Sequence, residues 1–365
     1  MARLGDYVRI RTGKLDANAS SDDGQYPFFT CAVEPLRIDT YSYDCECVLV
    51  AGNGDLNVKY YDGKFDAYQR TYIIESLDKT VVTVPYLYRF LDKYVETLRQ
   101  QAIGGVIKYI KLGNLTEAEI PLPSVDEQSK IVIKLNKANE LIALRKEQLA
   151  KLDQLVKSRF IELFGNLVIG DKVNTNKQKI GEIASVTKLA GFEFTKYIQY
   201  KEQGDIIMLR GLNCKKGHLV LDDIKWIDKE TSDLLPRSKL YYGDILMTYA
   251  GTIGDVAMVD ADDKYHLAPN VAKITLNDKR ACNPIFLMHL FMYTNDYIMT
   301  FASVVAQASI NMEKIRNFEY YFPPVELQNQ FVAFVEQTDK SKLAIQQSLD
   351  KLETLKKSLM QEYFG

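Results

Sequence analysis

The stretches that decide the fold are Glu119–Gly165, EIPLPSVDEQSKIV…LAKLDQLVKSRFIELFG, and Glu319–Gly365, EYYFPPVELQNQFV…LDKLETLKKSLMQEYFG. Aligned with a constant offset of 200 and no gap, their 47 positions contain 14 identities. Gln128, Phe164 and Gly165 are among the residues with an identical counterpart 200 positions later. This match is far above what unrelated sequences share, so the chain is a tandem duplication.

Each stretch predicts a long helix. No Gly or Pro interrupts residues 124–164, Ser124 can cap the start with Glu127 three residues on, and Gly165 and Gly365 suit a helix C-terminus. Apolar residues form a heptad seam in each copy. The first seam is Leu135, Ala138, Ile142, Leu149, Leu152 and Val156, interrupted by Arg145; the second is Phe331, Val335, Thr338, Ile345, Leu349 and Leu352, interrupted by Lys342. Two helices of ~60 Å favour an antiparallel pair with a globular domain at each end; the alternative is two unrelated surface helices.

The two halves also open alike, with Leu4-Gly5-Asp6 and Ile180-Gly181-Glu182 at an offset of 176, so the second copy holds 24 more residues. Between these ends the halves share little identity. Strands are predicted at Cys47–Ala51, Thr71–Ile74, Ile206–Leu209 and Lys239–Tyr242. Turn residues typical of a hairpin occur in Gly52–Lys64, and Gly243–Val259 predicts a strand, a glycine turn and a strand. Helices are predicted at Pro85–Gln100 and Pro284–Phe301.

We therefore predict an α+β fold: two globular mixed α/β domains joined by two long helices packed as an antiparallel coiled coil, with an internal pseudo-twofold repeat. The predicted domains are 1–121 and 166–322, and the predicted helices are 122–165 and 323–365. Halves that are similar at their ends and different in between suit a common structural frame that carries two different recognition surfaces.

Composition places the chain among ordinary globular proteins, with 47% hydrophobic and 26% charged residues. It has no apolar run of membrane-spanning length and no apolar segment near Met1, so we expect no membrane span and no secretory signal. The five scattered cysteines suit free thiols in the cytoplasm. Cys45 and Cys47 have the wrong spacing for zinc; the alternation of Tyr43, Cys45, Cys47 and Leu49 indicates a strand face instead.

Charge and motifs give no sign of a catalytic centre. The net charge is −2, and residues 1–120 and 166–320 carry 14 and 19 Lys or Arg against 17 and 19 Asp or Glu. Any DNA binding must therefore use local cations. The three histidines have no metal spacing, and P-loop, G-x-G-x-x-G and G-x-S-x-G motifs are absent. Asn283-Pro284-Ile285-Phe286 differs by one residue from a methyltransferase loop, but it reads better as a helix start.

The duplicated stretches carry a family resemblance. Its features are the proline-then-glutamine segments Pro121–Gln128 and Phe322–Gln328, the long helices ending in Phe-Gly, the segment Gly243–Val259, and Ala51–Gly54 followed by Lys59–Ala67. Together they resemble the specificity subunit of Type I restriction–modification systems, the HsdS family. The resemblance covers nearly the whole chain. Leu327, where the first copy has Glu127, departs from the capping box and leaves the start of the second helix open.

This resemblance implies a non-catalytic subunit that reads DNA. Each variable domain would read one half of a bipartite, asymmetric site in double-stranded DNA, and the helices would set the spacing and bind two modification (methyltransferase) subunits. S-adenosylmethionine, ATP and Mg would belong to partner subunits, which can include restriction (translocase and nuclease) subunits. No cofactor, metal or catalytic residue is expected in this chain, and no membrane partner.

Base contacts call for Arg, Lys, Asn, Gln, Ser or Thr on loops that reach a groove edge, and phosphate contacts call for further Lys or Arg; Tyr60 is a candidate for stacking on a sugar. Candidates in the first domain are Arg11, Lys14, Asn53, Asn57, Lys59, Tyr60, Lys64, Gln69 and Arg70. Candidates in the second domain are Lys188, Lys196, Arg210, Asn213, Lys215, Lys216, His218, Thr248, Thr252 and Asn270. Each could equally be a solvated loop residue or part of a turn.

Four lysines recur on the helices outside the seams, Lys151 and Lys157 in the first copy and Lys351 and Lys357 in the second. We predict that they mark a surface for two identical partners, although lysines on a solvated helix face are common. Two other functions stay open: a coiled-coil adaptor that joins two proteins, and a standalone methyltransferase or nuclease, which the missing motifs disfavour.

Overall fold

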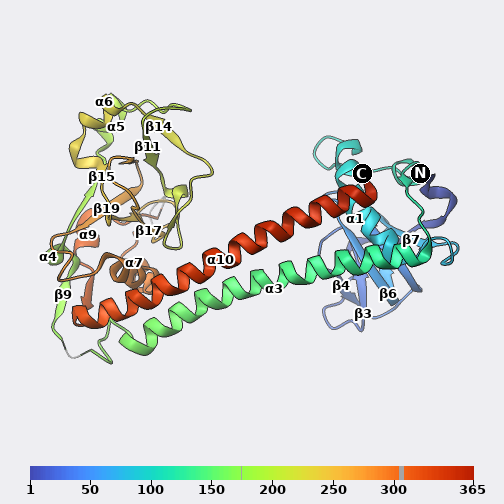
Figure 1. The fold of residues 1–365 in the computed structure, drawn as a ribbon, viewed down its shortest axis with the longest axis horizontal. Helices are drawn as coiled ribbons and strands as arrows, with labels where there is room; N and C mark the ends of the chain where they lie inside the picture. Colours follow the sequence, from blue (N-terminus) through green and yellow to red (C-terminus); the bar gives the residue numbers. More distant parts are fainter. Residues whose placement is uncertain (174, 304–307) are drawn as a thin grey trace. The chain divides into compact units, whose positions relative to one another are not determined.

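The computed structural model describes residues 1–173, 175–303 and 308–365. The chain divides into two compact units, one of Met1–Gln148 with Ile345–Gly365 and one of Leu149–Ala344. Each unit holds one globular domain and a part of both long helices, α3 (Val125–Phe164) and α10 (Val325–Phe364) (Figure 1).

The first domain contains a six-stranded sheet of order β2-β7-β5-β6-β3-β4 with α1 packed on it, and a separate two-stranded sheet of β1 and β8. Its strands are β1 (Ala2–Arg3), β2 (Val8–Thr12), β3 (Tyr26–Phe29), β4 (Leu36–Ile38), β5 (Tyr43–Ala51), β6 (Val58–Ala67), β7 (Thr71–Ser76) and β8 (Glu119–Ile120). Its helices are η1 (Leu4–Asp6), η2 (Ala17–Ala19), α1 (Val84–Gln101) and α2 (Leu112–Thr116). Residues Tyr43, Cys47 and Leu49 of β5 share one buried cluster, which confirms the predicted strand face.

The second domain contains two four-stranded sheets, of order β10-β19-β16-β17 and β14-β11-β18-β15. Its strands are β9 (Lys177–Lys179), β10 (Ala184–Lys188), β11 (Ile206–Leu209), β12 (Cys214–Lys215), β13 (His218–Leu219), β14 (Lys225–Ile227), β15 (Lys239–Leu240), β16 (Ile245–Thr248), β17 (Val256–Met258), β18 (Tyr265–Leu267), β19 (Val271–Leu276) and β20 (Glu319–Tyr321). Its helices are α4 (Ile180–Ile183), α5 (Gly191–Tyr197), η3 (Gly211–Asn213), α6 (Lys229–Asp233), η4 (Pro236–Ser238), α7 (Pro284–Tyr293), α8 (Asn295–Met299) and α9 (Met312–Arg316).

The two domains share one frame. The strand order β2-β7-β5-β6 in the first has the same connectivity as β10-β19-β16-β17 in the second. The register also repeats, since Thr12 pairs with Tyr72 and Lys188 pairs with Ala272. Most of the extra residues of the second copy therefore lie between β10 and β16, where β11, β14 and β15 form a second sheet together with β18. The frame thus extends into the middles, where sequence identity is too low to reveal it.

The long helices run antiparallel within each unit. In the first unit Lys134 Nζ lies 3.3 Å from Tyr363 Oη and Lys146 pairs with Glu353 at 2.9 Å, so positions rise on α3 as they fall on α10. In the second unit Lys342 of α10 pairs with Asp153 of α3 at 2.7 Å, which continues the same antiparallel order of positions. The predicted seam residues Leu135, Val156 and Val335 are buried, which confirms the heptad pattern.

The helix ends complete the domain cores. Phe364 packs against Tyr86 of α1 with ring centroids 5.3 Å apart, and Phe164 packs against Phe286 of α7 at 5.1 Å. These rings occupy equivalent places in the two units because both pairs are related by the offset of 200. Each domain is therefore closed by the end of one long helix and the start of the other.

Several predicted elements are adjusted. The predicted helix Pro284–Phe301 is interrupted at Thr294, whose hydroxyl donates to Leu290 O at 2.7 Å and lies 3.1 Å from Tyr320 Oη. The strand predicted at Lys239–Tyr242 ends at Leu240 because Asp244 N donates to Tyr241 O and closes a turn. Part of Gly52–Lys64, where the sequence has turn residues typical of a hairpin, belongs to a strand, since β6 begins at Val58.

The helix termini behave as predicted. Glu127 N donates to Ser124 Oγ at 3.4 Å, which confirms the cap of α3. Gly165 has φ +62° and its N–H donates to Ile161 O, which confirms a left-handed helix end. Within the described ranges, no helix is long and apolar enough to cross a membrane. Nor do those ranges contain a cluster of three or more His, Cys, Asp or Glu that could hold a metal.

Candidate nucleic-acid interface

Four loops of the first domain converge through backbone and amide hydrogen bonds. Gln69 N donates to Leu15 O at 2.9 Å, and Gly52 N donates to Arg70 O at 2.8 Å. The Asn57 amide donates to Cys31 O at 2.9 Å. Six of the predicted contact residues lie in these loops or directly beside them: Lys14, Asn53, Asn57, Lys59, Gln69 and Arg70.

The remaining three candidates of the first domain lie on strands and have contacts of their own. Arg11 pairs with Glu75 at 2.5 Å and lies over the Tyr43 ring at 5.1 Å. Tyr60 donates to Glu46 at 2.9 Å, and desolvation together with this carboxylate raises the pKa of Tyr60 to about 12. Lys64 lies over the Tyr41 ring at 4.7 Å. The structure therefore does not place these three in the loop cluster.

Two residues that were not predicted from the sequence also contact the loop 52–57. The Arg99 guanidinium donates to Leu56 O at 2.8 Å, and Lys108 O accepts from Gly54 N at 2.9 Å. Both residues belong to segments that are distant in sequence from the loop 52–57. Their place became visible only through these contacts, since nothing in the local sequence distinguishes them.

Five candidates of the second domain line one groove of about 480 Å³. They are Arg210, Lys215, Thr248, Thr252 and Asn270. Phe194 and Tyr200 form part of the same wall, with ring centroids 5.7 Å apart. Neither ring was predicted from the sequence, although aromatic side chains can stack on bases and sugars.

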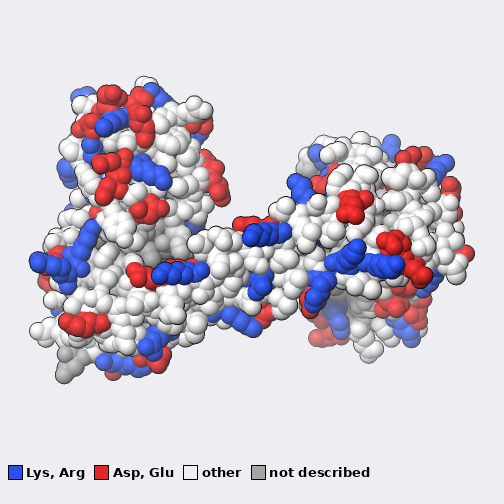
Figure 2. Space-filling model, viewed as in Figure 1, with Lys and Arg blue, Asp and Glu red and all other residues white. Residues whose placement is uncertain are grey.

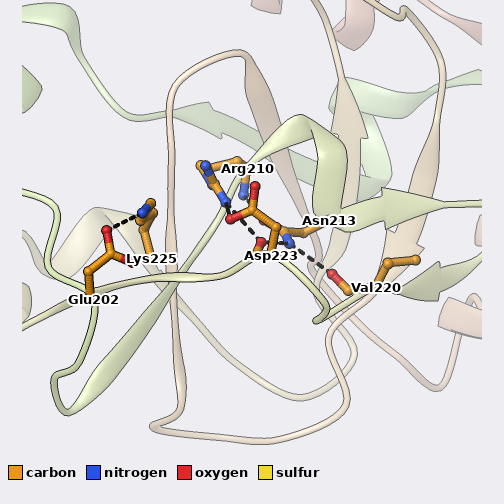
Figure 3. Close-up of polar contacts among 6 residues, drawn as sticks. All are labelled: Glu202, Arg210, Asn213, Val220, Asp223 and Lys225. Atoms are coloured by element: carbon orange, nitrogen blue, oxygen red, sulfur yellow. Dashed lines mark hydrogen bonds and ion pairs between the residues drawn. The ribbon is translucent and has the colours of Figure 1, made fainter. Parts of the chain in front are cut away.

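A polar network holds the groove in shape (Figure 3). Arg210 Nη2 donates to both the carbonyl and the carboxylate of Asp223 at 2.8 Å. Beneath them Asn213 is fully buried; its amide accepts from Arg210 N at 3.0 Å and donates to Asp223 O at 2.9 Å. A third contact from Asn213 reaches Val220 O at 2.8 Å. Lys225 and Glu202 form a separate ion pair nearby.

Two predicted contacts have a structural role in this network. Asn213 uses its amide inside the domain, as described above. Thr248 is buried; its hydroxyl accepts from Asp255 N at 2.9 Å and donates to Thr252 O, so it shapes the glycine turn that follows β16. The polar side-chain atoms of both residues therefore already have partners within the domain.

The other candidates of the second domain lie outside the groove. Lys216 and His218 line a larger cavity of about 810 Å³ together with Lys157 and Met288. Lys188 lies over the Tyr249 ring at 5.5 Å, and Lys196 over the Tyr197 ring at 4.9 Å. Arg210 and Lys215 thus line one cavity, and their sequence neighbour Lys216 lines another.

The four helix lysines are exposed on α3 and α10. Lys151 and Lys157 belong to the second unit, and Lys351 and Lys357 to the first. Lysines and arginines alternate with acidic residues over the face drawn in Figure 2. Binding of a polyanion would therefore depend on individually placed cations, as the net charge already indicates.

Fold and surface together define a class of protein: a duplicated α+β chain whose two domains repeat one frame, carry different polar loops, and are bound to a pair of long helices. Residues 1–154 and 172–356 match the family described as Type I restriction modification DNA specificity domain. The chain belongs to this family.

Relatives agree with this assignment. The chain is 40% identical to the Escherichia coli Type I restriction enzyme EcoDI specificity subunit over 154 residues, 42% of this chain and 34% of that protein. It is 24% identical to the EcoBI specificity subunit over 76% of this chain and 64% of that protein. It thus spans less than two thirds of the length of these two relatives. The MjaVIII specificity subunit of Methanocaldococcus jannaschii is 21% identical over 99% of this chain and 90% of its own length.

A solved structure has the same fold. The S subunit of a Type I restriction–modification system from M. genitalium superposes with a TM-score of 0.61 at 16% identity, covering 100% of this chain and 95% of that chain. At this identity the similarity concerns the fold alone.

Proposed function

We propose that this chain is the non-catalytic DNA-specificity subunit of a Type I restriction–modification complex, in which each domain reads one half of a bipartite, asymmetric site. The observation that carries this proposal is the combination of one repeated frame with two different surfaces. The first domain extends the frame with β3 and β4, whereas the second adds the sheet of β11 and the groove around Arg210. Two domains that share a frame but differ in their surfaces suit two half-sites of different sequence.

The chemistry would lie on partner chains. Methyltransferase subunits would bring S-adenosylmethionine, and restriction subunits, where present, would bring ATP and Mg. The recurring lysines Lys151, Lys157, Lys351 and Lys357 are the proposed contacts for two identical methyltransferase subunits. All five cysteines are free thiols, which supports a place in the reducing cytoplasm.

Expression with the cognate methyltransferase subunits, followed by mapping of methylated adenines in the genome, tests the proposal. We expect one bipartite motif. Replacing residues 180–320 with the equivalent segment of another specificity subunit should change one half of that motif and leave the other unchanged. A motif in which neither half changes would contradict the two-reader assignment, and DNA binding with complete indifference to sequence would favour the adaptor.

A further inference from the structure

We propose that Arg210 reads a guanine in the half-site of the second domain, and that Asp223 and Asn213 hold its guanidinium for this task. This inference rests on the proposed function and adds the identity of one base. The Arg210 guanidinium is partly accessible, and an exposed carboxylate, Asp223, and a buried amide, Asn213, fix its position (Figure 3).

Arg210 is held at both ends. Its backbone N–H donates to the buried Asn213 amide at 3.0 Å, and its Nη2 donates twice to Asp223 at 2.8 Å. Asn213 also binds Asp223 O, so one side chain fixes the arginine and its carboxylate partner together. A guanidinium that is already ordered loses less side-chain entropy on binding, which favours contact with a defined acceptor.

The guanidinium still has donors to offer. Nη2 makes both hydrogen bonds to Asp223 and Nε is buried, so the two N–H groups of Nη1 are the ones left for a ligand. The Arg210 side chain is 20% exposed and lines the 480 Å³ groove. A ligand in the groove can therefore reach an arginine whose hydrogen-bonding capacity is only partly used.

Electrostatics favour a base edge over a phosphate. Each cation of the groove already has a carboxylate beside it, Asp223 at Arg210 and Asp255 at Lys215 at 2.7 Å. These carboxylates repel an approaching phosphate but tolerate an uncharged base. Arginine has donors only, and guanine is the base that presents two acceptors, N7 and O6, in the major groove.

The experiment uses the complex with its methyltransferase subunits and the motif determined for the unaltered chain. Arg210→Ala should make one G·C position of one half-site degenerate. Methylation of the original motif should fall about 5- to 150-fold, the factor that corresponds to a lost bidentate contact of about 1–3 kcal/mol. Arg210→Lys should show the same degeneracy, because lysine keeps the charge but lacks the planar fork. Asp223→Asn should weaken discrimination at that same position.

Lys225→Ala is the matched control, since Lys225 forms a comparable ion pair next to the network. It should leave the motif unchanged. Copurification with the methyltransferase subunits checks that each variant is folded. A uniform fall over all sequences in Arg210→Ala that Arg210→Lys restores would indicate a phosphate contact and overturn the proposal, as would an unchanged motif. If the unaltered complex methylates no defined motif, the proposed function itself fails.

Discussion

At the scale of single residues, the repeat preserves two buried glutamines. Gln328 accepts from Asn283 N at 2.9 Å and donates to Pro323 O at 2.8 Å. Gln128 accepts from Thr83 N at 2.9 Å and donates to Pro123 O at 3.0 Å. Each glutamine thus ties the start of a long helix to the start of the domain helix. Gln128 and Gln328, which are identical in the repeat, therefore have the same structural role in both units.

Gln328→Ala should therefore lower the free energy of unfolding by about 1–3 kcal/mol, because it leaves a buried N–H and a buried carbonyl without partners. Urea unfolding measures the change, and hydrogen exchange at the Asn283 amide should accelerate. Gln337→Ala, an exposed change on the same helix, should stay within about 0.5 kcal/mol of the unaltered protein. Equal free energies of unfolding for Gln328→Ala and Gln337→Ala would contradict the role of Gln328 in joining the two helix starts.

His289 makes stability depend on pH. Burial lowers the pKa of His289 to about 3, with Lys342 and His218 adding positive charge nearby. Below about pH 6.5 the unfolded chain gains a proton that the folded state does not accept. Stability is therefore fully present above pH 6.5 and is lost at up to ~1.4 kcal/mol per pH unit as the pH falls toward 3.

His289→Gln should reduce this slope between pH 6 and 4.5 by about 1.4 kcal/mol per unit, as measured by urea unfolding at several pH values. His218→Gln, which removes an exposed histidine near His289, should leave most of the slope in place. The buried His266 and the carboxylates contribute equally to all three proteins and cancel in the comparison. A slope that does not differ between the unaltered protein and His289→Gln would refute the assignment.

At the scale of elements, the long helices combine an apolar seam with charged interruptions. Lys342 occupies a seam position, pairs with Asp153 at 2.7 Å and Asp339 at 3.3 Å, and is 20% exposed. A charge in a seam favours one register at a cost in stability. Arg145 interrupts the other seam and has a buried Nε without a partner within the described ranges.

Lys342→Leu should raise the free energy of unfolding by about 1 kcal/mol, because an apolar side chain fills the seam and the largely exposed aspartates return to water. Thermal unfolding checks the change. Lys340→Leu, at an exposed position two residues earlier, should have no such effect. A loss of stability in Lys342→Leu would mean that the ion pairs outweigh apolar packing.

At the scale of the whole molecule, the proposed function makes the helices a spacer between two readers. Residues 142–148 and 349–355 face each other in the antiparallel register given by the Lys146–Glu353 pair. Deleting both heptads keeps each seam in phase and shortens each helix by ~10 Å. The gap between the half-sites of the methylated motif should then shrink by about three base pairs.

Methylation mapping measures this gap directly, and the sequences of both half-sites should stay the same. Deleting only one of the two heptads is the control; it shifts the facing helices out of register and should abolish methylation. An unchanged gap after the double deletion would show that the helices do not set the spacing.

The duplication, the two long helices with their caps and seams, and the α+β class can all be predicted from the amino-acid sequence. These features depend on local periodicity and on repetition, which are visible without any long-range contact. The helix ends at Gly165 and the strand face of Cys45 and Cys47 followed from the same local rules. The break at Thr294 did not, because it depends on a contact with Tyr320 that lies far along the chain.

Only the tertiary structure decided how the candidate residues group. It separated Lys216 from Arg210, buried Asn213 and Thr248, and added Phe194 and Tyr200 to one groove. It also revealed that the common frame continues where the sequences no longer match. The physical reason is that strand pairing and register rest on backbone hydrogen bonds, which many different side chains permit, whereas burial of a loop residue depends on partners distant in sequence.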